Sequence, residues 1–549
     1  METNRNSHIN YFSWLWNHAA RIRYNVLTRV LLGICQVGLG LLLVWLSKQF
    51  IDVTIHADDE AIWRMVAMMV GVVAVGIAIR QVIYYGVVVA ETKQVNGLRK
   101  MTFDALMHKQ LFSEKEMHSG DVTSRLTKDI EMVCDVQVSL FPQMVISTVQ
   151  VIGAFLLMRS MDAVLAWILL LMTPVIVIAG KLISRKLRRM TEIVRKKESS
   201  VQMFVQEGVE HNALVRSLRG EDYVVNQLDS RQQDWTNHVL RRTRFSVVTR
   251  SMLAVCFGFG YLFAFVWGGL QLRDGIITIG VMTSFLQLVG QIQYPILNLL
   301  NMAPVVVHAT VSVDRLQELM EKPEKNTSSS NPLYIKGEVG VLMEDVGFKY
   351  SSEGRKVFQH FSYDFKPGSR VAIMGETGIG KTTIFRLMLA LVNPDWGKIE
   401  VYSNGSRYPV SDQTRINFAA VPQGNSLMSG TVRFNLSLAN PDATEEMMKK
   451  ALHIAMADFV WDLPNGLDTE LGERGIGLSE GQAQRIAIAR GLLMPGQVML
   501  FDEISSALDV DTERELLRQL FRMTDKTLIF VTHRREVSEI CDYVINLWA

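Results

Sequence analysis

Six long apolar runs occupy the first 300 residues of the chain, and polar or charged stretches separate them. A helix needs about 20 apolar residues to cross the hydrocarbon core of a bilayer. The runs are of that size, so they predict six membrane-spanning helices. Six buried helices of a large soluble protein are the alternative, but so many runs in succession argue against it. The predicted spans are residues 30–47, 65–90, 136–158, 163–180, 251–270 and 276–300.

The connections between these runs are unequal in length. Most are short, whereas residues 91–135 and 181–250 are long, charged and free of obvious helix breakers. These two stretches hold too few apolar residues to build a core of their own. We therefore expect helices that continue beyond the membrane, reverse and return.

Basic residues mark the cytoplasmic side of a membrane protein. They cluster after the fourth run, where residues 181–189 contain five, and before the fifth run, where residues 241–250 contain four. The connection after the first run is instead acidic, with Asp52, Asp58, Asp59 and Glu60. This asymmetry predicts a multi-pass protein with both termini in the cytoplasm. We expect the plasma membrane, which in a bacterium is the inner membrane.

The hydrophobic pattern changes after residue 320. Residues 321–337 are polar and contain proline and serine, as linkers do. Beyond them, short β-like runs alternate with helical patterns, which is typical of an α/β domain. The fold class is therefore multidomain: residues 1–320 form an all-α six-helix transmembrane domain, and residues 338–549 form an α/β P-loop NTPase domain.

Composition and charge add two exclusions. The formal net charge is only +2, so nothing suggests nucleic acid as a partner. The four cysteines are scattered without CxxC spacing, so they are expected to be small buried hydrophobes and not disulfide partners or metal ligands.

Residues 375–383, GETGIGKTT, match the P-loop pattern between a strand-like run, RVAIM, and a helix-like run, IFRLMLAL. Gly375, Gly378 and Gly380 allow the backbone to wrap a phosphate closely, where N–H groups and a helix N-terminus supply positive potential. Lys381 can neutralise the β- and γ-phosphates, and the Thr382 hydroxyl can ligate Mg²⁺. The motif predicts a site for ATP with Mg²⁺.

A second motif, VMLFDE at residues 498–503, ends in two acidic residues and completes this site. Four apolar residues predict a buried strand, and Asp502 at its end can hold Mg²⁺, directly or through water. Glu503 projects differently and can polarise the attacking water. A second metal anchor is the alternative role for Glu503.

Residues 478–482, LSEGQ, resemble the LSGGQ signature of ATP-binding cassette (ABC) transporters, and AQRIAIARGLL follows as it does in that family. The chain is similar to an exporter-type half-transporter over almost its whole length. The resemblance implies that two nucleotide-binding domains enclose two ATP molecules. Each site would join the P-loop of one subunit to the signature of the other.

The resemblance also implies roles for single residues. Tyr350 would stack on adenine, Gln423 would reach Mg²⁺ and the water, and His533 would contact the γ-phosphate. Ser479 and Gly481 would touch the γ-phosphate of the opposite site, with Asp509 across the interface. Further expected nucleotide contacts are Glu376, Thr377, Ile379, Thr383 and Gln482.

One residue departs from the family pattern. Glu480 replaces a small glycine and puts a carboxylate at a helix start near the partner's phosphate. The helix dipole tolerates an acid there, but a carboxylate that pointed inward would repel the phosphate. We therefore expect the Glu480 side chain to face solvent and hydrolysis to survive.

Together these features predict an ATP-driven exporter or flippase of a hydrophobic or amphipathic substrate. A homodimer is favoured, and a heterodimer with asymmetric sites is the alternative. A nucleotide-gated channel would not need Glu503, and a soluble ABC-type ATPase would not need the spans. Arg80, Gln287 and Gln291 lie within predicted spans and are candidates to line the pathway.

Overall fold

The computed structural model describes residues 10–547, except 55–57, 108–118, 321–330, 351–355, 377, 425, 473–476 and 505–507, and except the side chains of 172–185, 250, 253, 256, 257, 303 and 356. The chain divides into two compact units. Residues up to 321, apart from segment 106–118, form a helical unit, and the second unit contains the residues from 322 onward.

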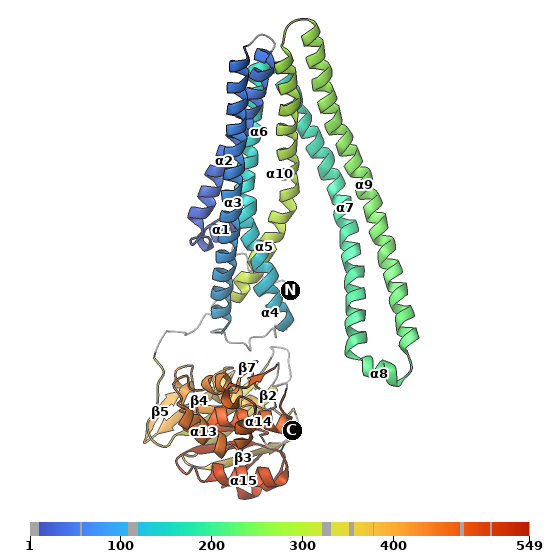
Figure 1. Ribbon diagram of the computed structural model, residues 1–549. Coiled ribbons are helices and arrows are strands. Elements are labelled where there is room, and N and C mark those ends of the chain that lie inside the picture. The colour runs from blue at the N-terminus through green and yellow to red at the C-terminus, as the bar shows by residue number, and fades with distance from the viewer. Residues whose placement is uncertain are drawn as a thin grey trace. The chain divides into compact units, whose positions relative to one another are not determined.

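The helical unit consists of long helices, which Figure 1 shows running roughly parallel to one another. Several are far longer than a bilayer requires, because the apolar runs continue without a break into polar helical sequence. Their bounds are α1 Tyr11–His18, α2 Arg23–Thr54, α3 Asp59–Met107, α4 Ser119–Ser124, α5 Ile130–Asp135, α6 Phe141–Met161, α7 Ala163–Glu210, α8 Asn212–Ser217, α9 Glu221–Arg273 and α10 Ile279–Met320, with π-helical turns at Arg125–Asp129 and Val136–Leu140.

Four helical segments in the described part of the chain are long and apolar enough to cross a membrane: Arg23–Thr54, Asp59–Met107, Gly120–Met161 and Ile279–Met320. The predicted spans 163–180 and 251–270 fall in α7 and α9, where several side chains lie outside the described set. The connection between the predicted spans 136–158 and 163–180 is a single residue, because α6 continues to Met161 and Asp162 alone separates it from α7.

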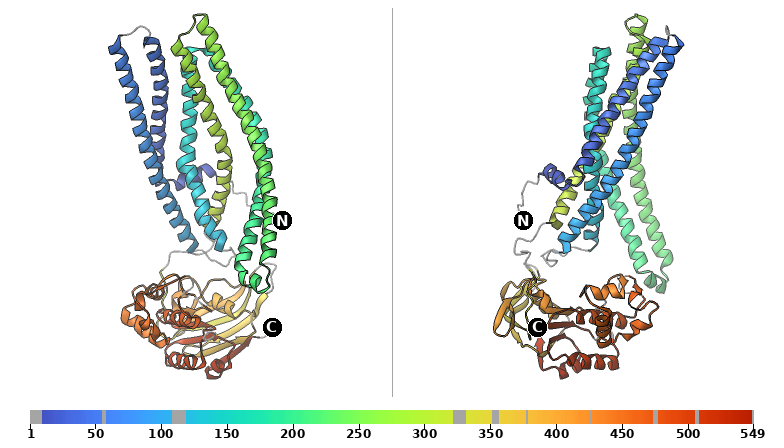
Figure 2. Two further views of the ribbon diagram at one scale, coloured as in Figure 1. Left: turned by 45° about the vertical axis from the view of Figure 1, so that its right-hand side comes forward. Right: turned by 60° about the vertical axis from the view of Figure 1, so that its left-hand side comes forward.

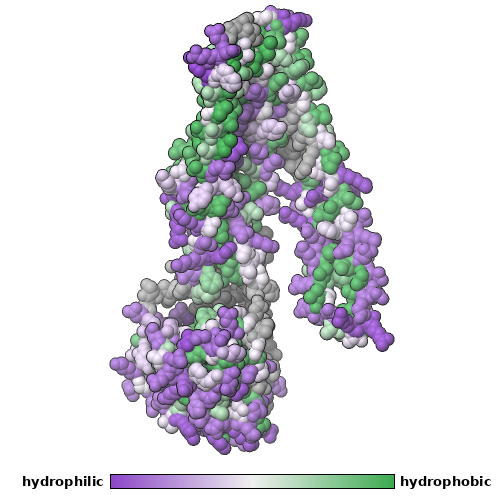
Figure 3. Space-filling view, viewed as in Figure 1, coloured by the Kyte–Doolittle hydropathy of each residue, from purple (hydrophilic) through white to green (hydrophobic). Residues whose placement is uncertain are grey.

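Helices α7 and α9 lie side by side along most of their length, and the short helix α8 joins them (Figure 2). Their polar halves are linked by an ion pair of 2.7 Å between the Lys197 and Asp234 side chains. In addition, the Arg231 guanidinium lies 4.4 Å from the centre of the Phe204 ring. Hydrophilic side chains are frequent on the α8 end of the pair, where exposed apolar side chains such as Val209 and Leu218 lie among them (Figure 3).

Asp162 organises the connection between α6 and α7. Its Oδ1 caps α7 by accepting the backbone N–H groups of Val164 (2.8 Å) and Leu165 (3.0 Å). Its Oδ2 accepts hydrogen bonds from Trp267 Nε1 (2.9 Å) and Gln271 Nε2 (2.8 Å) on α9. Burial by itself would raise the pKa of Asp162, but these four hydrogen bonds hold it below its ordinary value. One carboxylate therefore joins the start of α7 to the end of α9, directly after α6.

A second carboxylate, Asp52 near the end of α2, caps the start of α10. Its Oδ1 accepts the Gly280 N–H and its Oδ2 accepts the Thr278 hydroxyl, both at 2.9 Å. The helices approach closely at this point. A Cβ built on Gly280 would lie 2.4 Å from the Lys48 carbonyl oxygen and 2.5 Å from Asp52 Oδ1. Only glycine fits there without moving a backbone.

We expect Gly280→Ala to destabilise the helical unit by about 1–3 kcal/mol, because the new methyl group must push α2 and α10 apart. The melting temperature of the purified protein in detergent measures the effect. Gly269→Ala on α9 is the matched control, since a Cβ there meets nothing within 4 Å. Equal melting temperatures for the two variants would contradict the close approach.

The second unit contains two main sheets. One is parallel, in the order β11-β3-β10-β9-β6, and the other is antiparallel, in the order β2-β1-β4-β5. The strands are β1 Gly340–Lys349, β2 Lys356–Phe365, β3 Arg370–Gly375, β4 Trp396–Ser403, β5 Ser406–Pro409, β6 Phe418–Val421, β7 Gly430–Thr431, β8 Glu470–Leu471, β9 Val498–Asp502, β10 Thr527–Val531 and β11 Tyr543–Leu547. The helices are α11 Lys381–Met388, α12 Val432–Ser437, α13 Glu445–Ile454, α14 Glu480–Leu492, α15 Val510–Phe521 and α16 Arg535–Ile540.

The parallel sheet forms the core of this unit. Every residue of β9 and β10 is buried, and the Phe501 and Phe530 rings stack with centres 4.9 Å apart. Strands β3 and β9 both pair in parallel with β10, so their carboxyl ends reach the same edge of the sheet. Ligands of open parallel sheets bind at such an edge. The predicted fold class, a helical domain followed by an α/β domain, is confirmed.

Candidate nucleotide site

The loop between β3 and α11 requires glycine at two positions. Gly378 and Gly380 have φ angles of +86° and +113°, which other residues adopt only with strain. A Cβ on Gly380 would also lie 2.4 Å from Val357 Cγ1 and 2.8 Å from Phe358 Cζ. These glycines let the backbone turn sharply into the N-terminus of α11, where unpaired N–H groups can bind an anion.

Lys381 lies buried at the first position of α11. Its Nζ donates to the carbonyl oxygens of Gly375 (2.6 Å) and Glu376 (3.1 Å), at the two ends of the strand-to-loop junction. The lysine thus braces the loop from inside. Its charge and the helix N-terminus both favour a phosphate within the loop. Ile379 donates its N–H to the Glu376 carbonyl at 3.4 Å, which closes the turn.

Thr382 and Asp502 meet across the sheet edge. The Thr382 hydroxyl donates to Asp502 Oδ2 at 2.9 Å, and Asp502 is only 3% exposed. Burial raises the pKa of Asp502 and the charge of Glu503 adds to the rise, whereas the Thr382 hydrogen bond and Lys381 oppose it. A hydroxyl and a carboxylate side by side are the hard oxygen ligands that Mg²⁺ prefers.

Glu503 follows Asp502 but points elsewhere, because its φ is +47°. Its N–H donates to the Val531 carbonyl at 2.9 Å, which holds this unusual backbone in place. Its Oε2 accepts a hydrogen bond from Gln423 Nε2 at 2.6 Å, and its Oε1 lies 3.7 Å from His533 Nδ1. Strain of this kind costs about 1–3 kcal/mol and is typical of functional sites.

Tyr350 lies beside the helix that follows the loop. Its hydroxyl hydrogen-bonds the Thr383 hydroxyl and accepts from Arg386 Nη1, both at 2.9 Å. Phe348 contacts its ring edge-on, with centres 4.9 Å apart. The ring is therefore held in one orientation while 38% of the residue stays exposed, as a stacking platform requires.

The signature residues lie at the start of α14. Ser479 caps this helix in a reciprocal pair with Gln482: Gln482 N–H donates to Ser479 Oγ at 3.2 Å, and Ser479 N–H donates to Gln482 Oε1 at 2.9 Å. Glu480 and Gly481 occupy the first turn, and the Glu480 side chain is exposed. Asp509 caps α15 by accepting the Thr512 N–H at 2.9 Å.

The structure therefore brings the P-loop and the acidic residues together, but it does not bring the signature residues to them. The P-loop, Asp502, Glu503, Gln423 and His533 meet at one sheet edge. Within the described residues, no hydrogen bond or ion pair joins Ser479, Gln482 or Asp509 to that edge. Thr377 lies outside the described residues.

Two contacts at the site were not predicted from sequence. Arg386 reaches the Tyr350 hydroxyl, and Gln484 Nε2 donates to the Glu503 carbonyl at 3.1 Å. The partners are 36 and 19 positions apart. No local pattern marks either residue, so only the tertiary fold reveals them.

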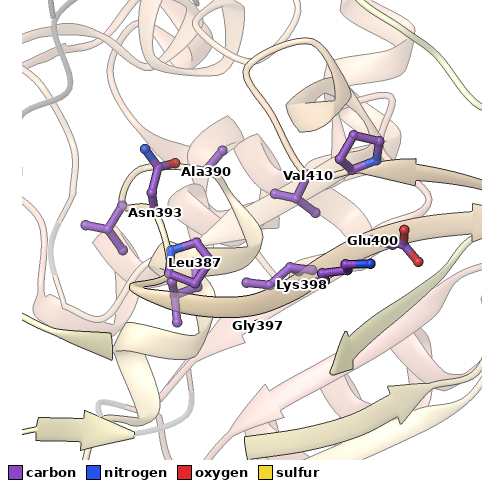
Figure 4. Close-up of a pocket in the computed structure, with 11 residues that line it drawn as sticks. Leu387, Ala390, Asn393, Gly397, Lys398, Glu400 and Val410 are labelled. Atoms are coloured by element: carbon purple, nitrogen blue, oxygen red, sulfur yellow. The ribbon is translucent and has the colours of Figure 1, made fainter. Parts of the chain in front are cut away.

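A separate hollow of about 420 Å³ lies in the same unit, between the end of α11 and strands β4 and β5 (Figure 4). Leu387, Ala390, Lys398, Glu400 and Val410 are among its lining residues. It shares no lining residue with the P-loop, so it is not part of the candidate nucleotide site.

Comparison with known families identifies both units. The model of the ABC transporter transmembrane region matches residues 26–296, and the ABC transporter model matches residues 358–506.

Individual relatives agree with this. A Bacillus subtilis ATP-binding/permease protein, whose name assigns it provisionally to multidrug export, is 25% identical over 95% of this chain and 91% of its own length. An ATP-dependent lipid A-core flippase of Photobacterium profundum is 27% identical over 82% of this chain and 78% of its own. The structure of a bacterial Atm1-family ABC exporter with ATP bound covers 96% of this chain and 94% of its own, at 21% identity and a TM-score of 0.81.

We expect Asp502→Asn to raise the melting temperature of the nucleotide-free protein at pH 7.5. Since folding raises the pKa of Asp502, keeping it ionised opposes folding at every pH above the ordinary aspartate value near 4. Asparagine removes that charge and still accepts from Thr382. The gain, about 2 °C for roughly 1 kcal/mol, should shrink as pH falls toward 4. A gain independent of pH would show that the buried charge is not its cause.

Proposed function

Because the chain belongs to the ABC transporter family and is an ATP-hydrolysing, membrane-integral exporter, we propose that it works as a homodimer that moves an amphipathic substrate by alternating access. The observation that supports ATP hydrolysis is the separation of the two neighbouring carboxylates, whereas the helix starts that carry the signature residues support the dimer. Asp502 turns to the Thr382 hydroxyl, and Glu503 turns to Gln423 and His533.

The first carboxylate is suited to a metal. Thr382 and Asp502 would hold Mg²⁺ together with Gln423 and the phosphate oxygens. When bound, this ion would neutralise charge on the transferred phosphoryl group. Lys381 and the N-terminus of α11 supply further positive potential to the same phosphates.

The second carboxylate is suited to act as a general base. Glu503 is held by its backbone and by Gln423 at a position where it can accept a proton from water. His533 lies on the opposite side of its carboxylate and is 60% exposed. It can therefore turn toward a γ-phosphate and orient the water there.

The composite site supports the dimer. Ser479, Gly481 and Asp509 lie on helix starts that are free to meet another subunit, and none bonds to the P-loop of its own chain in the described part. In the proposed dimer, the partner subunit's Ser479 would close the γ-phosphate side of each site. Closure of the two domains would then drive the helical units between inward and outward states.

The proposed orientation puts both termini in the cytoplasm, in a bacterial inner membrane. It is supported by exposed basic side chains on α7, α8 and α9, such as Arg188, Arg216 and Arg241. A heterodimer is the alternative arrangement. Its partner chain would carry the usual glycine where this chain has Glu480, so the two ATP sites would differ.

We expect Glu503→Gln to lower the ATP hydrolysis rate about 10²- to 10⁴-fold, because the amide cannot accept the proton. ATP binding should be retained, since the phosphate contacts are unchanged. Steady-state hydrolysis and binding of a labelled ATP measure the two effects in the purified protein. Glu446→Gln, an exposed acid on α13, is the control and should match the wild type. Normal hydrolysis by Glu503→Gln would leave Glu503 only as a metal anchor.

Mixing two inactive variants tests the shared site. Lys381→Ala disables the P-loop, and Ser479→Arg blocks the signature. In a mixed homodimer of the proposed kind both changes fall in one site and leave the other complete, so hydrolysis should recover to about half of the wild-type rate per mixed dimer. Co-expressed chains with different tags provide that dimer. No recovery in the isolated mixed dimer would mean that the sites are not shared between chains.

A further inference from the structure

A polar hollow lies within the helical unit, between α2, α3, α6 and α10, and has a volume of about 530 Å³. Two arginines and four glutamines line it, and no aspartate or glutamate does. The hollow is thus positively charged, although it is bordered by the most apolar parts of the chain. Its polar lining residues are Arg29, Gln36, Arg80, Gln143, Gln150 and Gln291.

Arg80 has no partner here. It lies in the apolar stretch 65–90 of α3, and it makes no hydrogen bond or ion pair with any residue that the structure describes. A charge within a span is costly and is retained mainly where it has a function.

Arg29 adds a second charge on α2. One of its Nη atoms donates to the Val138 carbonyl, whereas its Nε is buried and has no hydrogen-bond partner among the described residues. Glu91 and Asp135 attract Arg29 electrostatically, but neither lines the hollow. A guanidinium carries five N–H groups, so Arg29 keeps donors beyond the one that bonds to Val138.

The glutamines make the hollow polar without cancelling this charge. Gln150 Nε2 donates to Gln291 Oε1, which ties α6 to α10 along one wall. Amide groups can both donate and accept, so they can solvate a polar headgroup in place of water. Gln287, the other candidate from the sequence, does not line the hollow.

An apolar hollow of about 520 Å³ adjoins the polar one. The two share Leu43, Val73 and Ile77, and the apolar hollow continues between α2 and α3 to Ser47 and Met69. Its only polar side chain, Ser47, uses its hydroxyl to donate to the Leu43 carbonyl at 2.8 Å. A charged hollow therefore lies next to an open apolar groove that could hold a hydrocarbon chain.

We propose that these two hollows form one binding site for an amphipath with an anionic headgroup. The headgroup lies between Arg29 and Arg80 and accepts their hydrogen bonds, and the apolar tail lies between α2 and α3. The inference rests on the proposed function, because it names the class of substrate that the exporter moves. Phosphate or carboxylate on a lipid and a free anion share the headgroup chemistry, and the tail requirement separates them.

Binding of a fluorescent phosphatidic acid to the full-length protein in neutral detergent tests this site, with ATP hydrolysis measured in parallel. Phosphatidylcholine and a cationic trimethylammonium lipid with the same acyl chains are the headgroup controls, and methyl phosphate is the free-anion control. We expect phosphatidic acid to bind at least about tenfold more tightly than the two lipid controls, the size of one charge-assisted hydrogen bond. Methyl phosphate should not displace it at equal concentration.

Arg80→Gln should weaken binding of phosphatidic acid at least about tenfold, and Arg80→Lys should restore most of it. Arg64→Gln is the matched control, since Arg64 is an exposed arginine of the same helix that lines neither hollow. Equal affinity for the three lipids, unchanged binding by Arg80→Gln, or equal displacement by methyl phosphate would each overturn the proposal. If the wild-type protein binds phosphatidic acid as expected but does not hydrolyse ATP, the proposed function fails and the binding site stands. The two failures are therefore distinguishable.

Discussion

Two consecutive carboxylates at the end of one buried strand impose the main constraint on the nucleotide-binding unit. In the proposed mechanism Asp502 and Glu503 act on the same phosphate group, and they share no hydrogen-bond partner although they are adjacent in the chain. The positive φ of Glu503 makes this possible, because it turns the second side chain away from the first. The N–H of Glu503, bonded to Val531, keeps the turn in place. Metal binding and proton transfer can then be assigned to different residues.

A comparable constraint acts in the helical unit, where charges must be accommodated among apolar helices. Asp52 and Asp162 resolve it by capping helix starts, so their charges are fully hydrogen-bonded. Arg29 and Arg80 instead keep N–H groups that no described residue accepts, and both line the polar hollow. The contrast separates carboxylates that hold the scaffold together from guanidinium groups that are available to a ligand.

The nucleotide site could largely be predicted because its motifs are local. A P-loop consists of neighbouring residues whose glycines and lysine act within one turn, so the pattern and the structure coincide. The contacts that the prediction missed join distant residues: Arg386 with Tyr350, and Gln484 with Glu503. The three helical residues of α6 beyond the predicted span 136–158 were missed for another reason. Nothing local indicates that a helix will run on to Met161 before Asp162 caps the next one.

The sequence by itself determined the class of the two domains, the phosphate-binding loop and the presence of cations within apolar runs. Each of these follows from hydrophobic period or from residues close together in the chain. Only the tertiary structure decided which polar residues share a space. Arg29 and Arg80 are 51 positions apart on different helices, yet they line one hollow because α2 and α3, consecutive in the chain, run antiparallel. Helix packing, which no local pattern encodes, creates that site.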